Sequence, residues 1–213
     1  MADPKYKFLS TPRTPVENRR FVAGKGKFVA DLDRPGMLHV ATLASHFPAG
    51  IINSIDTSAA LAMPGVVDVI TGAEIGKAVQ PLMNGLDTPN VRRFPLAVDR
   101  VRYAGEWVAV VVAQSRAIAE DAAEKIIVDV TPEPFVLDAE EALLETSPPV
   151  HPEHGSNLLL DKKFVWGPVD EDFAAAANSL SFSVIWGRNS TVPIETFGVL
   201  AEWNGWDQML DIW

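Results

Sequence analysis

Short apolar runs separated by turn residues are the main pattern of the chain from residue 20 onward. Runs of this length, rich in valine and isoleucine and bounded by Gly, Pro or Asp, are typical of strands. The expected strands before residue 135 are Phe28–Leu32, Met37–Leu43, Ile51–Asp56, Val66–Ile70, Val101–Tyr103, Glu106–Ala113 and Ile126–Val130. The run Trp107–Ala113 is apolar on both faces, which predicts a strand at the centre of a sheet.

Two stretches between these strands have helical character. Residues 56–58 can cap a short helix over Ala59–Met63, which Pro64 and Gly65 end. Ser115 is the expected cap of a helix that reaches about Lys125 and carries apolar residues at helical spacing. Residues 72–94, with scattered Gly and Pro, are expected to be irregular. Alternating strands and short helices predict a mixed α/β or α+β domain over roughly residues 19–135.

The pattern changes after residue 135. Residues 138–144 are expected to form a short helix, and the Pro-rich stretch 147–155 is a plausible domain boundary. Beyond it we expect a helix over Asp170–Ala177. We also expect four strands: Leu158–Val165, Leu180–Arg188, Gly198–Trp203 and Leu210–Trp213. The apolar run at 210–213 suggests that strand pairing continues on another segment, so that the second unit is incomplete.

Composition narrows the classes of function. The chain has 213 residues and a net charge of −10, with 28 acidic against 18 basic residues, which argues against nucleic acid as a partner. No apolar run approaches the roughly 20 residues that span a membrane, and the polar first residues lack a secretory signal, so we expect a cytoplasmic protein without a membrane span. The chain has no cysteine, which excludes thiolate ligands for zinc or iron–sulfur clusters.

No complete catalytic site can be assembled from residue patterns alone. His151-Pro152-Glu153-His154 contains potential metal ligands, but it lies in a Pro-rich stretch without the rigid support of a metal site, so we interpret it as a solvated linker. Gly24-Lys25-Gly26 precedes a predicted strand and lacks the third glycine of a dinucleotide-binding loop. The six tryptophans indicate a packed interface or a core.

Several segments nonetheless carry a resemblance to one known family: Arg20–Asp31, Leu38–Ile51, Asp56–Gly72, Leu96–Glu106, Ala119–Glu124, Val150–Glu153 and Gly167–Phe173. They resemble the molybdenum-bearing large subunits of the xanthine dehydrogenase, aldehyde oxidase and carbon monoxide dehydrogenase family. Gly167–Phe173, for example, is similar to a Gly-Asp-Val-Asp-x-x-Phe segment of that family. Together they extend over nearly all of residues 19–213.

The resemblance implies an α+β fold in which an a/b hammerhead domain precedes the incomplete start of a molybdopterin-binding α/β domain. Its implied divisions are an extended arm over 1–18, the hammerhead over 19–135, a Pro-rich crossing over 136–155 and the molybdopterin-binding part over 156–213. It also implies an enzyme that hydroxylates an aldehyde or N-heterocycle, its small-molecule substrate, with oxygen from water. Molybdopterin would be bound mostly outside this chain, on the remaining molybdopterin-binding polypeptide. Iron–sulfur clusters and FAD would lie on partner subunits.

The match has limits that bear on the site. The family usually has proline where this chain has Trp107, and its cofactor-binding Thr-Gln, glycine-rich loop and C-terminal glutamate base have no counterpart here. No catalytic, cofactor-binding or metal-binding residue can therefore be placed on this chain, which is expected to be inactive alone.

Two residues are candidates for a supporting role. Arg188 and the segment Pro193–Gly198, with Glu195, resemble a basic residue followed by Pro-[Met/Leu]-Glu-x-x-Gly near the start of the molybdenum domain. A carboxylate flanked by Ile194 and Phe197 needs strong donors if it is enclosed, and Arg188 is one candidate. Glu195 is interpreted as an anchor below the cofactor site or as a direct contact to substrate or cofactor.

Two other readings of the chain remain open. It is alternatively a non-catalytic hammerhead-type interaction or assembly module, for which a monomer without molybdenum is expected. It is also interpretable as an inactive truncated product, which would aggregate through an unpaired apolar edge strand.

Overall fold

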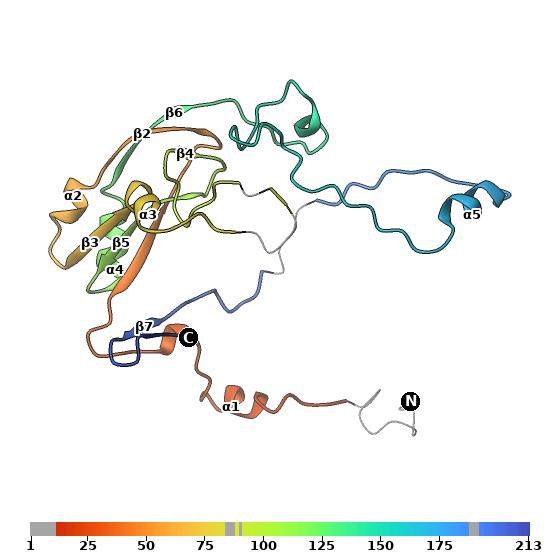
Figure 1. Ribbon diagram of the computed structural model, residues 1–213. Coiled ribbons are helices and arrows are strands. Elements are labelled where there is room, and N and C mark those ends of the chain that lie inside the picture. Colours follow the sequence, from red (N-terminus) through yellow and green to blue (C-terminus); the bar gives the residue numbers. More distant parts are fainter. Residues whose placement is uncertain (1–11, 84–87, 90, 188–191) are drawn as a thin grey trace. The chain divides into compact units, whose positions relative to one another are not determined.

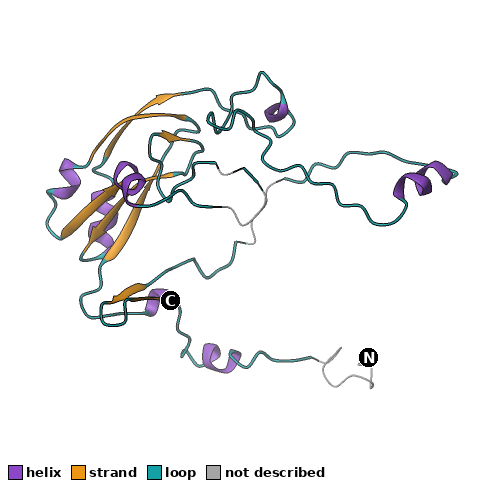
Figure 2. Cartoon of the chain, viewed as in Figure 1, coloured by secondary structure: helices purple, strands orange, loops and turns teal. Residues whose placement is uncertain are grey.

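The computed structural model of the chain describes residues 12–83, 88–89, 91–187 and 192–213 (Figure 1). These residues form two compact units, one comprising residues 36–179 and the other formed by residues up to 35 together with 180–213. The elements in chain order are α1 (Asn18–Val22), η1 (Val29–Asp31), β1 (His39–Ala44), β2 (Gly50–Asp56), α2 (Ser58–Leu61), β3 (Val66–Thr71), α3 (Gly72–Ala78), β4 (Arg100–Val101), β5 (Trp107–Ala113), α4 (Arg116–Ala123), β6 (Ile127–Pro132), η2 (Glu141–Leu143), α5 (Val169–Ala175), β7 (Ala201–Asn204) and β8 (Met209–Ile212). Short helices and antiparallel strands alternate (Figure 2), which confirms the predicted α+β class.

The first sheet of the larger unit has the order β1-β5-β3, with both neighbours antiparallel to β5. Alternate side chains of β5 face opposite sides, and both sides are buried. Ala109, Val111 and Ala113 join the core formed with α4 and α2, whereas Val108 joins a second core with Val130 of β6. The central position predicted for the run 107–113 is therefore confirmed.

Helix α4 covers this sheet because its alanine-rich face packs on β1 and β5. The Ser115 hydroxyl accepts a hydrogen bond from the Ile118 amide at 3.3 Å, which confirms the predicted cap. At the start of α2 the Asp56 carboxylate accepts the Ser58 amide at 2.9 Å, whereas Thr57 at the N-cap position makes no side-chain hydrogen bond, so Asp56 supplies the cap predicted at residues 56–58.

The second sheet of this unit has the order β4-β2-β6. Strand β2 pairs with both neighbours antiparallel, and the register with β6 shifts between Ile52 and Ser54. Side chains of Leu43, Ile55 and Val128 pack against both cores, so they join the two sheets of the unit.

A glycine allows the segment before β4 to cross the start of α3. A Cβ atom added to Gly72 would lie 1.7 Å from the carbonyl oxygen of Ala97. Ala97 is buried, and its amide donates to the Trp107 carbonyl at 2.7 Å. The close approach at Gly72 thus fixes the chain that leads into β4.

The smaller unit contains the hairpin β7–β8, whose strands are antiparallel. Leu200 and Trp213 extend the pairing through two backbone hydrogen bonds of 3.0 and 2.9 Å. The guanidinium of Arg34 lies 4.8 Å from the ring of Trp213 and 3.6 Å from the Glu202 carboxylate. Strand β7 supplies a partner for one edge of the strand at 210–213 within the chain, and the expectation that the pairing continues on another segment stays a prediction.

Other expected elements differ from the structure. Phe28–Leu32 is not a strand but contains η1, in which the Asp31 carboxylate accepts the Phe28 amide at 3.0 Å. Residues 72–94 begin with α3, and a Thr71–Glu74 capping box explains that helix. No strand forms at 158–165 or within the described part of 180–188, because neither stretch has a partner strand to complete its hydrogen bonds.

Candidate functional site

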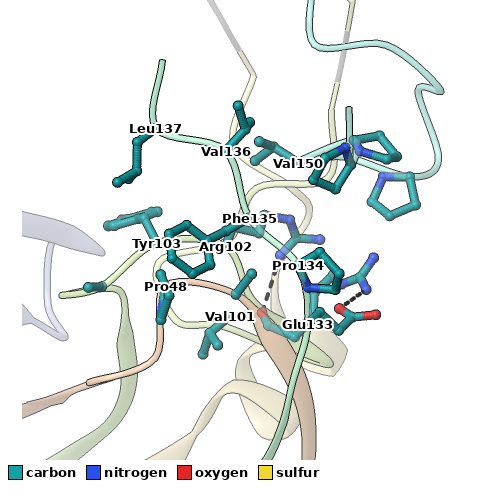
Figure 3. Close-up of a pocket in the computed structure, with 16 residues that line it drawn as sticks. Pro48, Val101, Arg102, Tyr103, Glu133, Pro134, Phe135, Val136, Leu137 and Val150 are labelled. Atoms are coloured by element: carbon teal, nitrogen blue, oxygen red, sulfur yellow. Dashed lines mark hydrogen bonds and ion pairs between the residues drawn. The ribbon is translucent and has the colours of Figure 1, made fainter. Parts of the chain in front are cut away.

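A half-open pocket of about 390 Å³ lies in the larger unit where β4 and β6 end (Figure 3). Its base comes from β4 and the turn after it, including Val101 and Arg102. Residues 133–137, which follow β6, form another side. The Pro-rich stretch 148–152 closes it, and Pro48 and Ala49 also line it, so four separate parts of the sequence meet here.

An ion pair secures one wall of the pocket. The Arg100 guanidinium on β4 donates to the carboxylate of Glu133, just after β6, and both side chains are largely enclosed. Arg100 lies on β4 and Glu133 directly follows β6, and these are the two strands that flank β2. The pair therefore holds together the ends of the outer strands of the second sheet.

Arg102 is less completely paired. Its side chain is 11% exposed, and its Nη1 donates to the Arg100 carbonyl over a long 3.4 Å. Nη2 lies 4.0 Å from the Asp99 carboxylate, which is itself largely exposed. Its Nε is buried and has no hydrogen-bond partner in the part of the chain that the structure describes. The positive charge of Arg102 also acts on the carboxylates of Glu106 and Glu153, where it favours the ionised form.

A buried carboxylate supports the turn that carries Arg102. The Glu106 side chain accepts the Arg102 amide at 2.5 Å, and Glu106 is almost fully buried. Burial raises the pKa of Glu106 above its usual value, and the hydrogen bond from Arg102 opposes this rise. The role of this residue is structural, because it is not among the residues that line the pocket.

The Pro-rich stretch is held close to Arg102 by His151 and Glu153. The Glu153 carboxylate accepts the Arg92 amide at 3.3 Å and lies 3.4 Å from His151 Nδ1. Burial lowers the pKa of His151, and the positive charge of Arg102 adds to this effect. His151 is thus more enclosed than a solvated linker would leave it.

The two histidines of the 151–154 motif do not converge. His154 Nε2 lies 3.3 Å from the Leu158 carbonyl oxygen, whereas His151 faces Glu153. Among residues 12–83, 88–89, 91–187 and 192–213, no three His, Cys, Asp or Glu side chains gather as a metal site would require.

Of the two residues proposed from sequence to support a cofactor site, the structure describes Glu195. Glu195 is exposed, and its neighbours Ile194 and Phe197 are also almost fully exposed. Arg188 lies outside the described residues. Its immediate neighbours therefore do not enclose the Glu195 carboxylate, which was the reason for expecting strong hydrogen-bond donors beside it.

The pocket itself was missed by sequence reasoning. Arg100 and Arg102 are ordinary basic residues next to and within a predicted short strand, and nothing in their spacing shows that Glu133 or residues 148–152 lie beside them. The available signal was the density of proline at 132–134 and 148–152, which predicts rigid extended walls.

Comparison with known proteins identifies the fold of these residues. Residues 23–134 match the family description "Aldehyde oxidase and xanthine dehydrogenase, a/b hammerhead domain". The chain belongs to this family. The pocket base and Glu133 lie within the matched residues of this hammerhead, whereas the Pro-rich wall lies beyond them.

Relatives of the hammerhead chain include enzyme large subunits of bacteria. It is 35% identical to the nicotine 6-hydroxylase large subunit of Paenarthrobacter nicotinovorans, over 95% of this chain and 25% of the relative. It is 32% identical to the carbon monoxide dehydrogenase large chain of Hydrogenophaga pseudoflava, over 88% of this chain and 25% of the relative. The structure of quinoline 2-oxidoreductase from Pseudomonas putida 86 matches 93% of this chain and 25% of its own, with 36% identity and a TM-score of 0.83. The chain spans about a quarter of the length of these relatives.

The described residues do not by themselves form a molybdopterin site. They contain no convergent metal ligands, and the buried unpaired polar atom, Arg102 Nε, lies in the hammerhead and not in residues 156–213. We therefore derive no catalytic step from this chain. Within the same residues, no helix is both long and apolar enough to cross a bilayer.

Proposed function

We propose that this chain is the N-terminal portion of the large subunit of a molybdenum hydroxylase, an oxidoreductase that acts on an aldehyde or an N-heterocycle with oxygen from water. The observation that carries the proposal is the continuous likeness to such large subunits. Relatives named as a nicotine hydroxylase and a quinoline oxidoreductase match more than nine-tenths of the chain. Both names refer to N-heterocyclic compounds, which favours that class of substrate.

Exposed apolar side chains support completion of the site by another polypeptide. All six tryptophans, including Trp166, Trp186 and Trp206, are at least 42% exposed. Phe164, Phe173 and many of their neighbours after residue 157 are exposed as well. Apolar surface on this scale is typical of a surface that another part of the protein covers. Of the two roles predicted for the tryptophans, interface fits these exposures.

The proposed assembly divides the chemistry among polypeptides. Residues 19–135 are the hammerhead domain, preceded by an arm over 1–18 and followed by a crossing over 136–155. Residues 156–213 open the molybdopterin-binding domain, which the remaining polypeptide completes. Molybdopterin supplies the oxidising centre when bound, and iron–sulfur and flavin subunits carry the electrons onward. A hetero-oligomer in the cytoplasm is the proposed state.

Mass and metal analysis of the native particle tests this proposal. The chain is purified with its associated polypeptides, each is identified by intact mass, and molybdenum is measured across the size-exclusion peak. We expect molybdenum to coelute with this chain and with a second polypeptide that contains the missing molybdenum-domain residues. A monodisperse monomer without molybdenum would instead support the non-catalytic assembly module. Full hydroxylase activity without a second molybdenum-domain polypeptide would refute the proposed division.

Glu195 and Arg188 are proposed to support the completed site. In the assembled enzyme, Glu195→Gln is expected to lower molybdenum content if Glu195 anchors the site, and to lower turnover at full content if it touches substrate. The matched control is Glu171→Gln in α5, since this glutamate is also exposed. If both cofactor content and turnover stay unchanged in Glu195→Gln, neither role is correct.

A further inference from the structure

We propose that residues 148–157, which we call the strap, are a pH-sensitive cover of the pocket: in mild acid the strap opens at His151 and Glu153 while Asn157 holds its other end. Val150 and Pro152 of the strap line the pocket, and Figure 3 shows Val150 across it from Tyr103. The strap and the pocket belong to the larger unit. The proposal goes beyond the proposed function and does not rest on it, because it involves neither a cofactor nor a partner chain.

Asn157 holds one end of the strap through hydrogen bonds to the backbone. Its Nδ2 donates to the carbonyl oxygens of Ala142 at 3.0 Å and Pro148 at 3.1 Å, and its Oδ1 accepts the Val150 amide at 2.8 Å. Ala142 lies in η2, so this side chain joins the strap to the helix that precedes it. A side-chain amide does not change its charge with pH, so this end is expected to stay closed in acid.

The other end of the strap is fastened by longer hydrogen bonds. The Glu153 carboxylate accepts the Arg92 amide at 3.3 Å and lies 3.4 Å from His151 Nδ1. Both distances exceed the roughly 2.9 Å at which such bonds are commonest. The His151 side chain is nevertheless enclosed, at 13% exposed, against 35% for Glu153. The strap is therefore expected to open first at this end, which would return His151 to water.

Charged groups on the strap and on the turn after β4 act on His151. Burial lowers the pKa of His151, and the positive charges of Arg102 and His154 lower it further, whereas the Glu153 carboxylate opposes them. Asp99 lies 4.0 Å from Arg102 but is 58% exposed, so solvent screens its charge. The closed strap thus favours the neutral imidazole.

The direction of the pH effect follows from this preference. In the opened strap His151 is in water, where a histidine has a pKa of about 6.5. As pH falls below that value, protonation favours the opened strap over the closed one. Burial alone would raise the pKa of Glu153, but backbone amides, including that of Arg92, and the charge of Arg102 hold it below its usual value. Glu153 therefore stays ionised while His151 titrates.

Amide hydrogen exchange of the full chain, followed residue by residue by NMR, tests the proposal. Rates at pH 7.5 and pH 5.5 are divided by the intrinsic rates at each pH, so that the ratio reports local opening. We expect the Arg92 amide to lose protection severalfold at pH 5.5, because Glu153 leaves it when the strap opens. The Val150 amide, which Asn157 holds, is expected to keep its protection.

Neutral variants identify the group that titrates. His151→Gln is expected to remove the acid response of the Arg92 amide, and His151→Asn repeats the test if glutamine disturbs the fold. The matched control His154→Gln should keep the response, since His154 Nε2 lies against the Leu158 carbonyl oxygen. Glu106→Gln should also keep it, which separates His151 from the buried carboxylate beneath Arg102.

The proposal fails if the Arg92 amide has the same protection at both pH values in the natural chain. It also fails if both neutral variants of His151 respond to acid as the natural chain does. Loss of protection at Val150 together with Arg92 would overturn it as well, because the whole strap would then detach and Asn157 would not hold one end.

Discussion

Gly72→Ala is expected to lower the free energy of unfolding of the larger unit by about 2–6 kcal/mol. The added Cβ would lie 1.7 Å from the Ala97 carbonyl oxygen, whereas real contacts of this kind stay beyond 3.0 Å, so the carbonyl must retreat by about 1.3 Å. Such a shift breaks the 2.7 Å hydrogen bond from the Ala97 amide to Trp107. A buried amide left unpaired costs about 1–3 kcal/mol, and overpacking adds about 1–3 kcal/mol.

Urea unfolding followed by circular dichroism measures this change, with Gly205→Ala as the matched control. No atom lies within 4 Å of a Cβ at Gly205, and its φ is not positive, so alanine fits there without strain. Gly205 lies in the smaller unit, so the control should leave the free energy of unfolding of the larger unit unchanged. A loss below about 1 kcal/mol in Gly72→Ala, or a loss equal to that of Gly205→Ala, would refute the close approach at Gly72.

Three further predictions concern the same unit. Ser115→Ala should lower the free energy of unfolding by about 1 kcal/mol, because α4 loses its cap, and Ser115→Asp should restore that stability. Equal losses in both variants would show that capping is not the cause. Val111→Ala should lower the free energy of unfolding by about 2–3 kcal/mol, because two methyl groups are lost and a cavity is left. Val40→Ala, at a 59% exposed position, should change it by less than about 0.5 kcal/mol. Similar urea midpoints for the two variants would contradict the central place of β5. The free energy of unfolding of Glu106→Gln, relative to that of the natural chain, should increase as pH rises from 4 to 7. The folded chain holds the pKa of Glu106 above its unfolded value, so the natural residue stabilises the fold most when protonated and loses that contribution as pH rises through the raised pKa. The glutamine oxygen can still accept the Arg102 amide, and a pH-independent difference in urea midpoint would contradict this reasoning.

The larger unit was largely predictable because its signals are local. The apolar run 107–113 reveals a central strand without knowledge of its neighbours, and Ser115 caps its helix through an amide three residues away. Family resemblance added the hammerhead assignment, which the match over residues 23–134 confirms. The division into two three-stranded sheets was not predictable, since it depends on pairing between strands far apart in sequence.

Expected strands failed to form where a stretch had no partner strand or where a local hydrogen bond favoured another conformation. The stretch 158–165 has the composition of a strand, yet a strand forms only when neighbouring backbone completes its hydrogen bonds. At Phe28, the carboxylate of Asp31 captures the backbone amide and favours a tight turn over an extended chain. The pocket could not be predicted because Arg102, Glu133 and residues 148–152 meet only in the folded chain.

The strand order β1-β5-β3 also determines when the hammerhead can fold during synthesis. Strands β1 and β3 leave the ribosome first, but neither pairs with the other, and both wait for β5. The 42 residues between Thr71 at the end of β3 and Ala113 at the end of β5 take about 2–8 s to translate at roughly 5–20 residues per second. For those seconds two apolar strands lack their common neighbour, which makes this the interval in which a nascent chain most needs protection from aggregation.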